Sequence, residues 1–246
     1  MIARLASIGL FVASWYLACA FVDGRVLPPP HNVLGVVWAE ARTGDLGFNL
    51  GATLARVVSS FMMAMIMGTA LGLAMGCFRK LDRLLDAWLL ILLNLPALVV
   101  VVLCYIWIGL TETALLTAVV LNKVPNTAVM MREAARALDP GLDEMARVFQ
   151  FSRIAYVRHV LVPQLSPFIA AASRSGLSLV WKIVLVVELL GRSNGVGFEI
   201  GSAFQLFDVA RILAYAFSFI AVILTIEIIL IQPLERHATR WRRQAA

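Results

Sequence analysis

Six long apolar runs constrain the fold of this chain more than any other feature of its sequence. An α-helix rises 1.5 Å per residue, so about 20 apolar residues are needed to cross the hydrocarbon core of a bilayer. The runs that approach or exceed this length occupy residues 5–22, 52–78, 87–108, 114–131, 167–187 and 210–231. The sequence therefore predicts an all-α membrane protein with six transmembrane helices in a single domain, residues 1–246.

Composition agrees with this class and argues against a nucleic-acid partner. The chain is 61% hydrophobic and 15% charged, whereas soluble domains are roughly 45–50% apolar and about 25% charged. Its net charge of +6 follows from basic residues that flank membrane spans. Cys19, Cys77 and Cys104 all lie in apolar runs, so we expect three small buried side chains and no metal site.

The basic residues also predict the orientation. Six spans leave both termini on one side, and a cytoplasmic placement puts most positive charge inside, as the positive-inside rule requires. The residues on that side would be Arg4, Arg79, Lys80, Arg83, Arg132, Arg136, Arg147, Arg153, Arg158, Arg236, Arg240, Arg242 and Arg243. We expect a multi-pass protein of the bacterial cytoplasmic (inner) membrane with both termini in the cytoplasm.

Two runs carry features of helix packing. Small residues recur at every fourth position of the second run, at Ala64, Gly68, Gly72 and Gly76. Such a stripe lets a neighbouring helix approach closely. In the third run Pro96 follows Asn94, and a proline kinks a helix and frees a carbonyl, as happens where helices line a cavity. Asn94 is thus a candidate for the pathway or, alternatively, for a hydrogen bond between helices.

Between the fourth and fifth runs the chain becomes charged and amphipathic. Asp139 and Pro140 are typical of a helix start, and Ser152 can cap a second helix that ends at Pro163. The sequence therefore predicts two short helices joined by a bend, within residues 139–162. The segment could rest on lipid head groups, or it could bind a partner protein.

A motif in this segment favours the partner. Glu144-x-Ala146, a slot at Gln150, and Val160-x-Val162-Pro163 resemble the EAA loop of ABC importer permeases, Glu-Ala-Ala-x3-Gly-x9-Ile-x-Leu-Pro. Glu133-Ala134-Ala135 spells the motif literally, but that register puts Asp139 in the glycine slot and Ser152 in the proline slot. We therefore take the register from Glu144.

The match departs from the motif at Met145 and at Gln150. Glycine in the second slot bends the chain with positive φ, whereas a side chain there costs roughly 1–2 kcal/mol. Either Gln150 bends the chain differently, or the first helix runs one turn longer.

The resemblance extends along the chain and narrows to nitrate/sulfonate/taurine-type permeases. Its pieces are Leu27–Pro30, Thr53–Val57, Trp107–Glu112, Trp181–Glu188 and Gly195-Val196-Gly197. It implies a type I importer fold, a second permease copy, two ATPase subunits that hold ATP and Mg, and a substrate-binding protein that delivers a small anion such as a sulfonate, nitrate or taurine. The residues implied in coupling to the ATPase are Glu144, Met145, Ala146, Arg147, Phe149, Gln150, Ser152 and Pro163.

The fifth run carries a polar stripe. At 100° per residue its polar side chains fall within an arc of about 140°. They are Arg174, Ser175, Ser178, Trp181, Lys182 and Glu188. A charge in mid-membrane costs about 2.5–3.5 kcal/mol, so such residues are candidates for a pathway or gate. The alternative is structural: snorkelling of Arg174, an ion pair of Lys182, and Glu188 at the outer mouth.

Two other classes of function are weaker. An ion-gradient-driven transporter could use Lys182, Glu188 and Asn94, but the sequence has no convincing internal repeat. A membrane enzyme would need clustered catalytic groups, whereas the three histidines are scattered. The sequence has no Gly-x4-Gly-Lys-Ser/Thr loop, so we expect this chain to bind no nucleotide or other cofactor itself.

Overall fold

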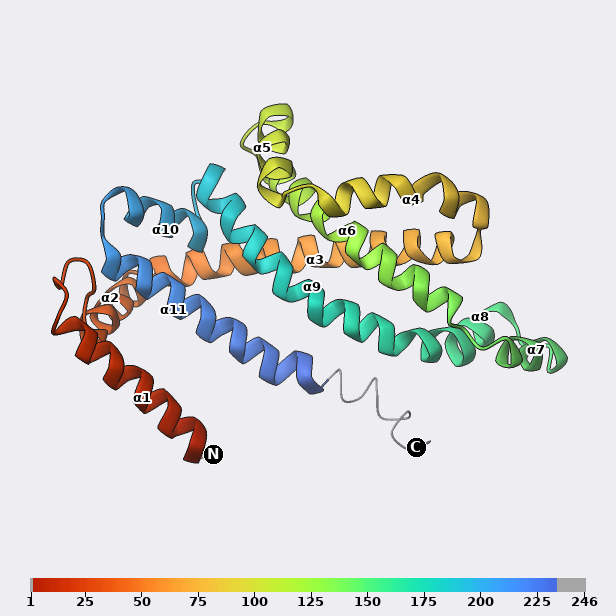
Figure 1. Ribbon diagram of the computed structural model, residues 1–246, viewed down its shortest axis with the longest axis horizontal. Helices are drawn as coiled ribbons and strands as arrows, with labels where there is room; N and C mark the ends of the chain where they lie inside the picture. The colour runs from red at the N-terminus through yellow and green to blue at the C-terminus, as the bar shows by residue number, and fades with distance from the viewer. Residues whose placement is uncertain (1, 234–246) are drawn as a thin grey trace. The chain divides into compact units, whose positions relative to one another are not determined.

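The computed structural model describes residues 2–233, and the regular secondary structure of this part is entirely helical (Figure 1). The helices are α1 Ile2–Cys19, α2 Pro30–Thr43, α3 Asp45–Cys77, α4 Arg79–Asn94, α5 Ala97–Ile108, α6 Glu112–Arg136, α7 Pro140–Val148, α8 Arg153–Tyr156, η1 Val157–Leu161, α9 Val162–Gly191, α10 Val196–Gln205, α11 Val209–Ile226 and η2 Glu227–Ile231. The elements η1 and η2 are π-helical turns. The predicted cytoplasmic residues Arg236, Arg240, Arg242 and Arg243 lie outside the described residues.

Four helices are long and apolar enough to cross a membrane by length and composition: Asp45–Cys77, Glu112–Arg136, Arg153–Gly191 and Val209–Ile229. The pair α4 and α5 raises this number to five, within residues 2–233, if the two helices form one span. The apolar part of α1 is the shorter segment Gly9–Cys19. All six expected runs therefore lie on helices, while six crossings remain a prediction.

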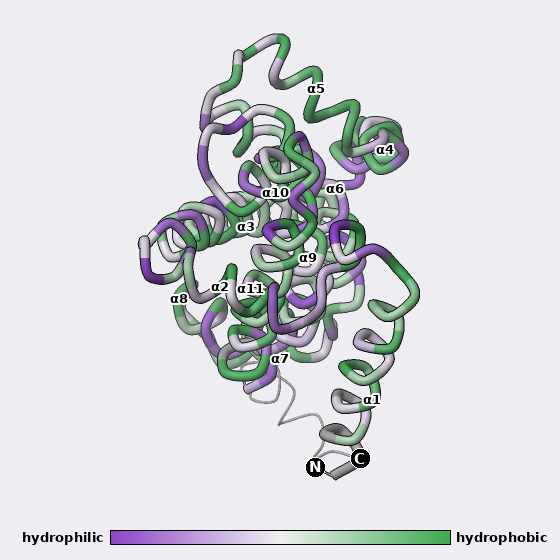
Figure 2. The backbone as a smooth tube through the Cα atoms, turned by 90° about the vertical axis from the view of Figure 1, so that its left-hand side faces the viewer, coloured by the Kyte–Doolittle hydropathy of each residue, from purple (hydrophilic) through white to green (hydrophobic). Residues whose placement is uncertain are grey.

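The third expected run is broken, where the sequence predicts a kinked helix. α4 ends at Asn94, α5 begins at Ala97, and the two helices are bent by 99° (Figure 1). A proline disfavours the helical conformation of the residue before it, and Leu95 accordingly has φ −72° and ψ 128°. Pro96 thus separates an amphipathic helix from α5, which is hydrophobic along nearly its whole length (Figure 2).

The chain folds as two compact units, each built from separate stretches. One contains residues 1–55 and 185–225, and the other contains residues 56–184 and 226–246. Both α3 and α9 contribute residues to each unit.

Close packing of α3 on α6 forms the centre of the unit of residues 56–184. A β-carbon added at Gly72 would lie 2.3 Å from the carbonyl oxygen of Ala128, and one added at Gly76 would lie 2.5 Å from Ala135 Cβ. Gly68 faces Thr127 at a similar 2.5 Å. The predicted small-residue contact is therefore confirmed, and α6 is the helix that it accommodates.

Ion pairs join α6 to its neighbours near both of its ends. Arg132 Nη1 lies 2.6 Å from Asp86 Oδ1 and 3.2 Å from Asp82 Oδ1, which ties α6 to α4. Arg56 Nη2 of α3 lies 2.6 Å from Glu112 Oε1 at the start of α6. Both arginine side chains are largely buried, so water screens these pairs less than it screens pairs at an open surface.

Candidate functional site

The helix α7 begins where the sequence predicts. The side chain of Asp139 accepts a 2.8 Å hydrogen bond from the backbone N–H of Gly141, and Pro140 is the first helical residue. Ser152 caps α8 in the same way, by accepting a 3.2 Å hydrogen bond from the N–H of Ala155. The two short helices and their bend are therefore present, between α6 and α9 (Figure 1).

The bend itself is made by Gln150, which has φ 50°. Its N–H donates to the carbonyl of Arg147 at 3.1 Å, and the N–H of Phe151 donates to the carbonyl of Ala146 at 2.9 Å. These two bonds define a Schellman motif, in which the positive-φ residue is usually glycine. Gln150 thus takes the glycine conformation with its side chain in place, and α7 is not extended.

Pro163 does not end the second helix, and that prediction is wrong. The chain continues as one helix over Arg153–Gly191, with the π-helical turn Val157–Leu161 inside it. The N–H of Val162 donates to the carbonyl of Val157 five residues earlier, and Pro163 follows within the first turn of α9. A proline interrupts the i→i−4 hydrogen bonds of a helix, and here it directly follows a turn whose hydrogen bond already runs to the fifth residue back, so the helix continues through Pro163.

The α7–α8 hairpin presents apolar side chains to the outside. Val148, Phe149 and Ile154 are 77%, 70% and 81% exposed, whereas Ala146 is buried. Met145 is partly exposed. Large apolar side chains that are exposed and bordered by polar residues are typical of interaction sites.

Charged residues border this surface. Arg147 pairs with Asp143 one turn earlier at 3.0 Å, while Glu144 is exposed and forms no ion pair or hydrogen bond with residues 2–233. A hollow of about 630 Å³ lies between the two short helices and includes Ala146, Arg147, Gln150 and Arg153 in its wall.

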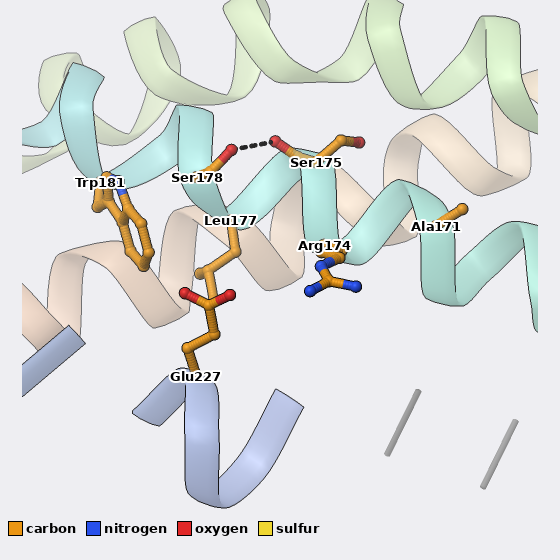
Figure 3. A pocket seen from close by; sticks show the side chains of 7 residues that line it. All are labelled: Ala171, Arg174, Ser175, Leu177, Ser178, Trp181 and Glu227. Atoms are coloured by element: carbon orange, nitrogen blue, oxygen red, sulfur yellow. Dashed lines mark hydrogen bonds between the residues drawn. The ribbon is translucent and has the colours of Figure 1, made fainter. Parts of the chain in front are cut away.

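Three of the predicted pathway residues surround a second hollow, of about 380 Å³. Arg174, Ser178 and Trp181 of α9 line it together with Glu227 of η2 (Figure 3). The Arg174 and Glu227 side chains extend into the same space from opposite sides in this view. Sequence reasoning missed Glu227, although a single carboxylate inside an apolar run of about 20 residues is a usable signal.

The other two charges of the predicted stripe are placed differently. Lys182 is exposed and is not among the residues that line the 380 Å³ hollow. Glu188 is 0% exposed; Thr53 Oγ1 lies 3.0 and 2.9 Å from its two carboxylate oxygens, and the N–H of Gly197 donates to Oε2 at 2.9 Å. Its carboxylate thus ties α9 to α3 and to the start of α10.

Asn94 is exposed at the last position of α4. Its amide donates a 2.8 Å hydrogen bond to the carbonyl of Leu90 in the same helix. Asn94 lines neither the hollow of the hairpin nor the hollow beside Arg174, and its pathway role stays a prediction.

Sequence reasoning also missed Lys123, which is 1% exposed in α6. The residue lies inside the expected span 114–131, and a lysine in an apolar run is a signal of the same kind as Glu227. A polar group in the other unit was missed as well: Arg211 lies 2.9 Å from Glu199 Oε2, and Tyr215 donates to Glu40 at 2.7 Å.

These features define a multi-pass helical membrane protein with an exposed amphipathic hairpin between two long helices. Residues 64–241 match the family described as the binding-protein-dependent transport system inner membrane component. The chain belongs to this family, and it is a permease subunit of an ABC importer.

Relatives support this assignment. The chain is 35% identical over 189 residues to SsuC of Escherichia coli (strain K12), named as an aliphatic sulfonates transport permease; the match covers 76% of this chain and 72% of that protein. It is 34% identical over 220 residues to the riboflavin transport system permease protein RibX of Chloroflexus aurantiacus, with 88% and 80% covered. The predicted family is confirmed.

A solved structure confirms the fold. An inward-facing MetNI methionine ABC transporter matches with a TM-score of 0.62 and 18% identity, over 84% of this chain and 99% of that chain. The predicted type I importer fold is therefore observed. The matches support the importer and give no support to the ion-gradient-driven transporter.

Proposed function

We propose that this permease imports a small anionic solute and that separate ATPase subunits drive it through the α7–α8 hairpin. The observation that carries the proposal is the hairpin surface of Val148, Phe149 and Ile154, which is exposed although it is apolar. Covering it with an ATPase would remove apolar surface from water, at about 25 cal/mol per Å².

The Schellman bend supports a docking role for the hairpin. A bend defined by two backbone hydrogen bonds holds α7 at a fixed angle to α8. A preorganised surface loses less conformational entropy on binding than a mobile one. A movement of the ATPase would then be passed to α9, because α8, η1 and α9 form one continuous helix.

The solute is proposed to be anionic because of Arg174, which lines the hollow beside α9 together with the carboxylate of Glu227. Its guanidinium can bind a carboxylate, sulfonate or phosphate through two parallel hydrogen bonds. The hydroxyl of Ser178 and the indole of Trp181 line the same hollow. SsuC is named for aliphatic sulfonates and RibX for riboflavin, so the choice of an anion rests on the residues of this chain.

The proposed assembly has two permease copies, two ATPase subunits that hold ATP and Mg, and a substrate-binding protein. Both termini of the permease would face the cytoplasm, where the basic residues near α4 and the hairpin lie under the positive-inside rule. This chain would then provide the path and the coupling surface, while nucleotide chemistry belongs to the ATPase.

Reversal of the charge at Glu144 tests the coupling surface. Glu144→Lys should lower the amount of ATPase subunit that co-purifies with the permease by about tenfold, because reversing a charge at a complementary interface replaces an attraction by a like-charge contact. Glu133→Lys is the matched control: it reverses the same charge in a Glu-Ala-Ala sequence on α6, where Glu133 is half-exposed and pairs with Arg132 and Arg136 of its own helix, and it should leave co-purification unchanged.

Normal co-purification and normal ATP hydrolysis by the Glu144→Lys variant would overturn the docking assignment. Stronger binding of that variant to anionic vesicles, without any change in its ATPase binding, would instead place the hairpin on lipid head groups, because the substitution adds positive charge. The solute class is tested in the complete transporter by stimulation of ATP hydrolysis with butanesulfonate, nitrate or riboflavin. Stimulation by riboflavin alone would contradict an anionic solute.

A further inference from the structure

Lys123 is buried in α6 beside a hollow of about 240 Å³ that is separate from the Arg174 hollow. The wall of this hollow includes the polar side chains of Lys123, Asn126 and Ser175, together with Leu93 and Leu179. Ser175 lines both hollows. Two cationic side chains, Arg174 and Lys123, therefore border neighbouring spaces that meet at one serine.

The ammonium group of Lys123 is poorly satisfied. It has three N–H donors, and one of them forms a long hydrogen bond of 3.4 Å to the carbonyl of Ala172 on α9. No carboxylate among residues 2–233 forms an ion pair with it. Buried lysines are ordinarily paired, so the structure leaves an unbalanced positive charge at this position.

The surrounding residues make room for this charge. A β-carbon at Gly176 would lie 2.5 Å from Lys123 Nζ and 2.3 Å from its Cε, so the glycine admits the end of the lysine side chain. The amide of Asn126 and the hydroxyl of Ser175 donate to carbonyls of their own helices at 3.3 Å each. The Asn126 amide and the Ser175 hydroxyl can instead donate to a ligand, since side-chain bonds to nearby backbone carbonyls are local and compete with other partners.

We propose that this hollow is an anion-binding subsite of the import pathway, in which Lys123 binds the oxyanion group of the solute. The inference rests on the proposed function and adds the residue that neutralises the solute charge within the membrane. A sulfonate, a carboxylate or nitrate fits this chemistry, because each offers several oxygen acceptors to the ammonium, hydroxyl and amide donors.

The test measures electrostatic preference in the complete transporter. Cys19, Cys77 and Cys104 are replaced by serine, and Ser175→Cys provides one thiol in the shared wall. Rates of modification are compared for two methanethiosulfonates, one with a sulfonate and one with a trimethylammonium group.

With Lys123 present, the anionic reagent should react faster than the cationic one. Lys123→Met should lower the ratio of the anionic to the cationic rate at least about tenfold, since close charges interact strongly away from water. Lys123→Arg should retain the ratio.

Lys80→Met is the matched control. It removes the same charge from an exposed lysine at the start of α4 and should leave the ratio unchanged. An unchanged ratio in the Lys123→Met variant, or a thiol that neither reagent reaches, would overturn the subsite. The coupling test on Glu144 is unaffected by either result, so the two proposals can fail separately.

A second measurement keeps Lys123 intact in case its substitution disturbs folding. Ethanesulfonate should slow modification of Ser175→Cys by the neutral methyl methanethiosulfonate, whereas ethyl methyl sulfone, a neutral analogue of similar shape, should not. Equal protection by both compounds would overturn the charge role. Protection by neither, together with a carboxylate of a second permease copy cross-linked to Lys123, would assign this lysine to the contact between copies.

Discussion

Two buried charges of opposite sign differ in how the fold satisfies them. Glu188 is surrounded by donors: the Thr53 hydroxyl lies within 3.0 Å of both carboxylate oxygens, and the N–H of Gly197 donates at 2.9 Å. Lys123 has one 3.4 Å bond to a carbonyl and a hollow beside it. A satisfied buried charge belongs to the architecture, whereas one left with unused donors can bind a ligand.

The largest expected effect is on Glu188→Leu, which tests the structural side of this comparison. The substitution leaves the Thr53 hydroxyl and the Gly197 N–H without their acceptor, at about 1–3 kcal/mol for each buried group. We therefore expect a loss of roughly 3 kcal/mol or more in the free energy of unfolding. Thermal unfolding in detergent measures it. A native unfolding temperature would show that Glu188 does not hold this unit together.

Gly195→Ala should have the next largest effect. Gly195 has φ 107°, and an added β-carbon would lie 2.5 Å from the Glu188 carboxyl carbon. The positive φ alone should cost about 1–3 kcal/mol once the residue carries a β-carbon. The clash with Glu188 adds to this cost, because the carboxylate is held by its hydrogen-bond donors and cannot move away. Gly201→Ala is the control, since its nearest neighbour would be 3.4 Å away. Equal unfolding temperatures for the two variants would contradict the rigidity of this site.

Gly176→Ala should have a smaller effect, although its contact with Lys123 is as short. The neighbouring atoms are the end of a flexible side chain, which can move into the adjacent hollow. We expect a loss of about 1 kcal/mol, typical of modest overpacking, and a change in anion preference at Ser175→Cys. A loss as large as that of Gly195→Ala would show that Lys123 is fixed in place.

The smallest effect is expected for Lys123→Met. Replacing a buried charge by an apolar group of similar length is often neutral or stabilising, and the one lost hydrogen bond is long. The free energy of unfolding should stay within about 0.5 kcal/mol of the native value. Thermal unfolding in detergent measures it. A loss of stability as large as that of Glu188→Leu would show that Lys123 is a structural residue. The difference between the two buried charges would then not hold.

The sequence predicts helices well where local rules decide. The starts of α7 and α8 follow from Asp139, Pro140 and Ser152, whose caps act within three residues. The close approach along Gly68, Gly72 and Gly76 follows from side-chain size. The importer class follows from the motif that begins at Glu144, because its residues are close together in the chain.

The helical periodicity of the sequence does not predict which residues pack against each face of a helix. The stripe on α9 is real as a pattern, yet Glu188 meets Thr53 from 135 residues earlier in the chain, and no helical period contains that contact. The sequence predicts a kink at Pro96 but not the 99° angle between α4 and α5, and it does not predict the π-helical turn before Pro163. A second Schellman bend lies at Phe207, which has φ 56°. The sequence does not predict it, because a bulky aromatic residue rarely adopts positive φ.

The contact between α3 and α6 has a mechanical consequence. At Gly68, Gly72 and Gly76 there is no room for even one added methyl group between the helices, so α3 and α6 cannot move closer together there. The end of α6 is joined to α7 by residues 137–139. If the hairpin couples to an ATPase as proposed, its movement would reach α6 through these three residues and would carry α3 along with α6.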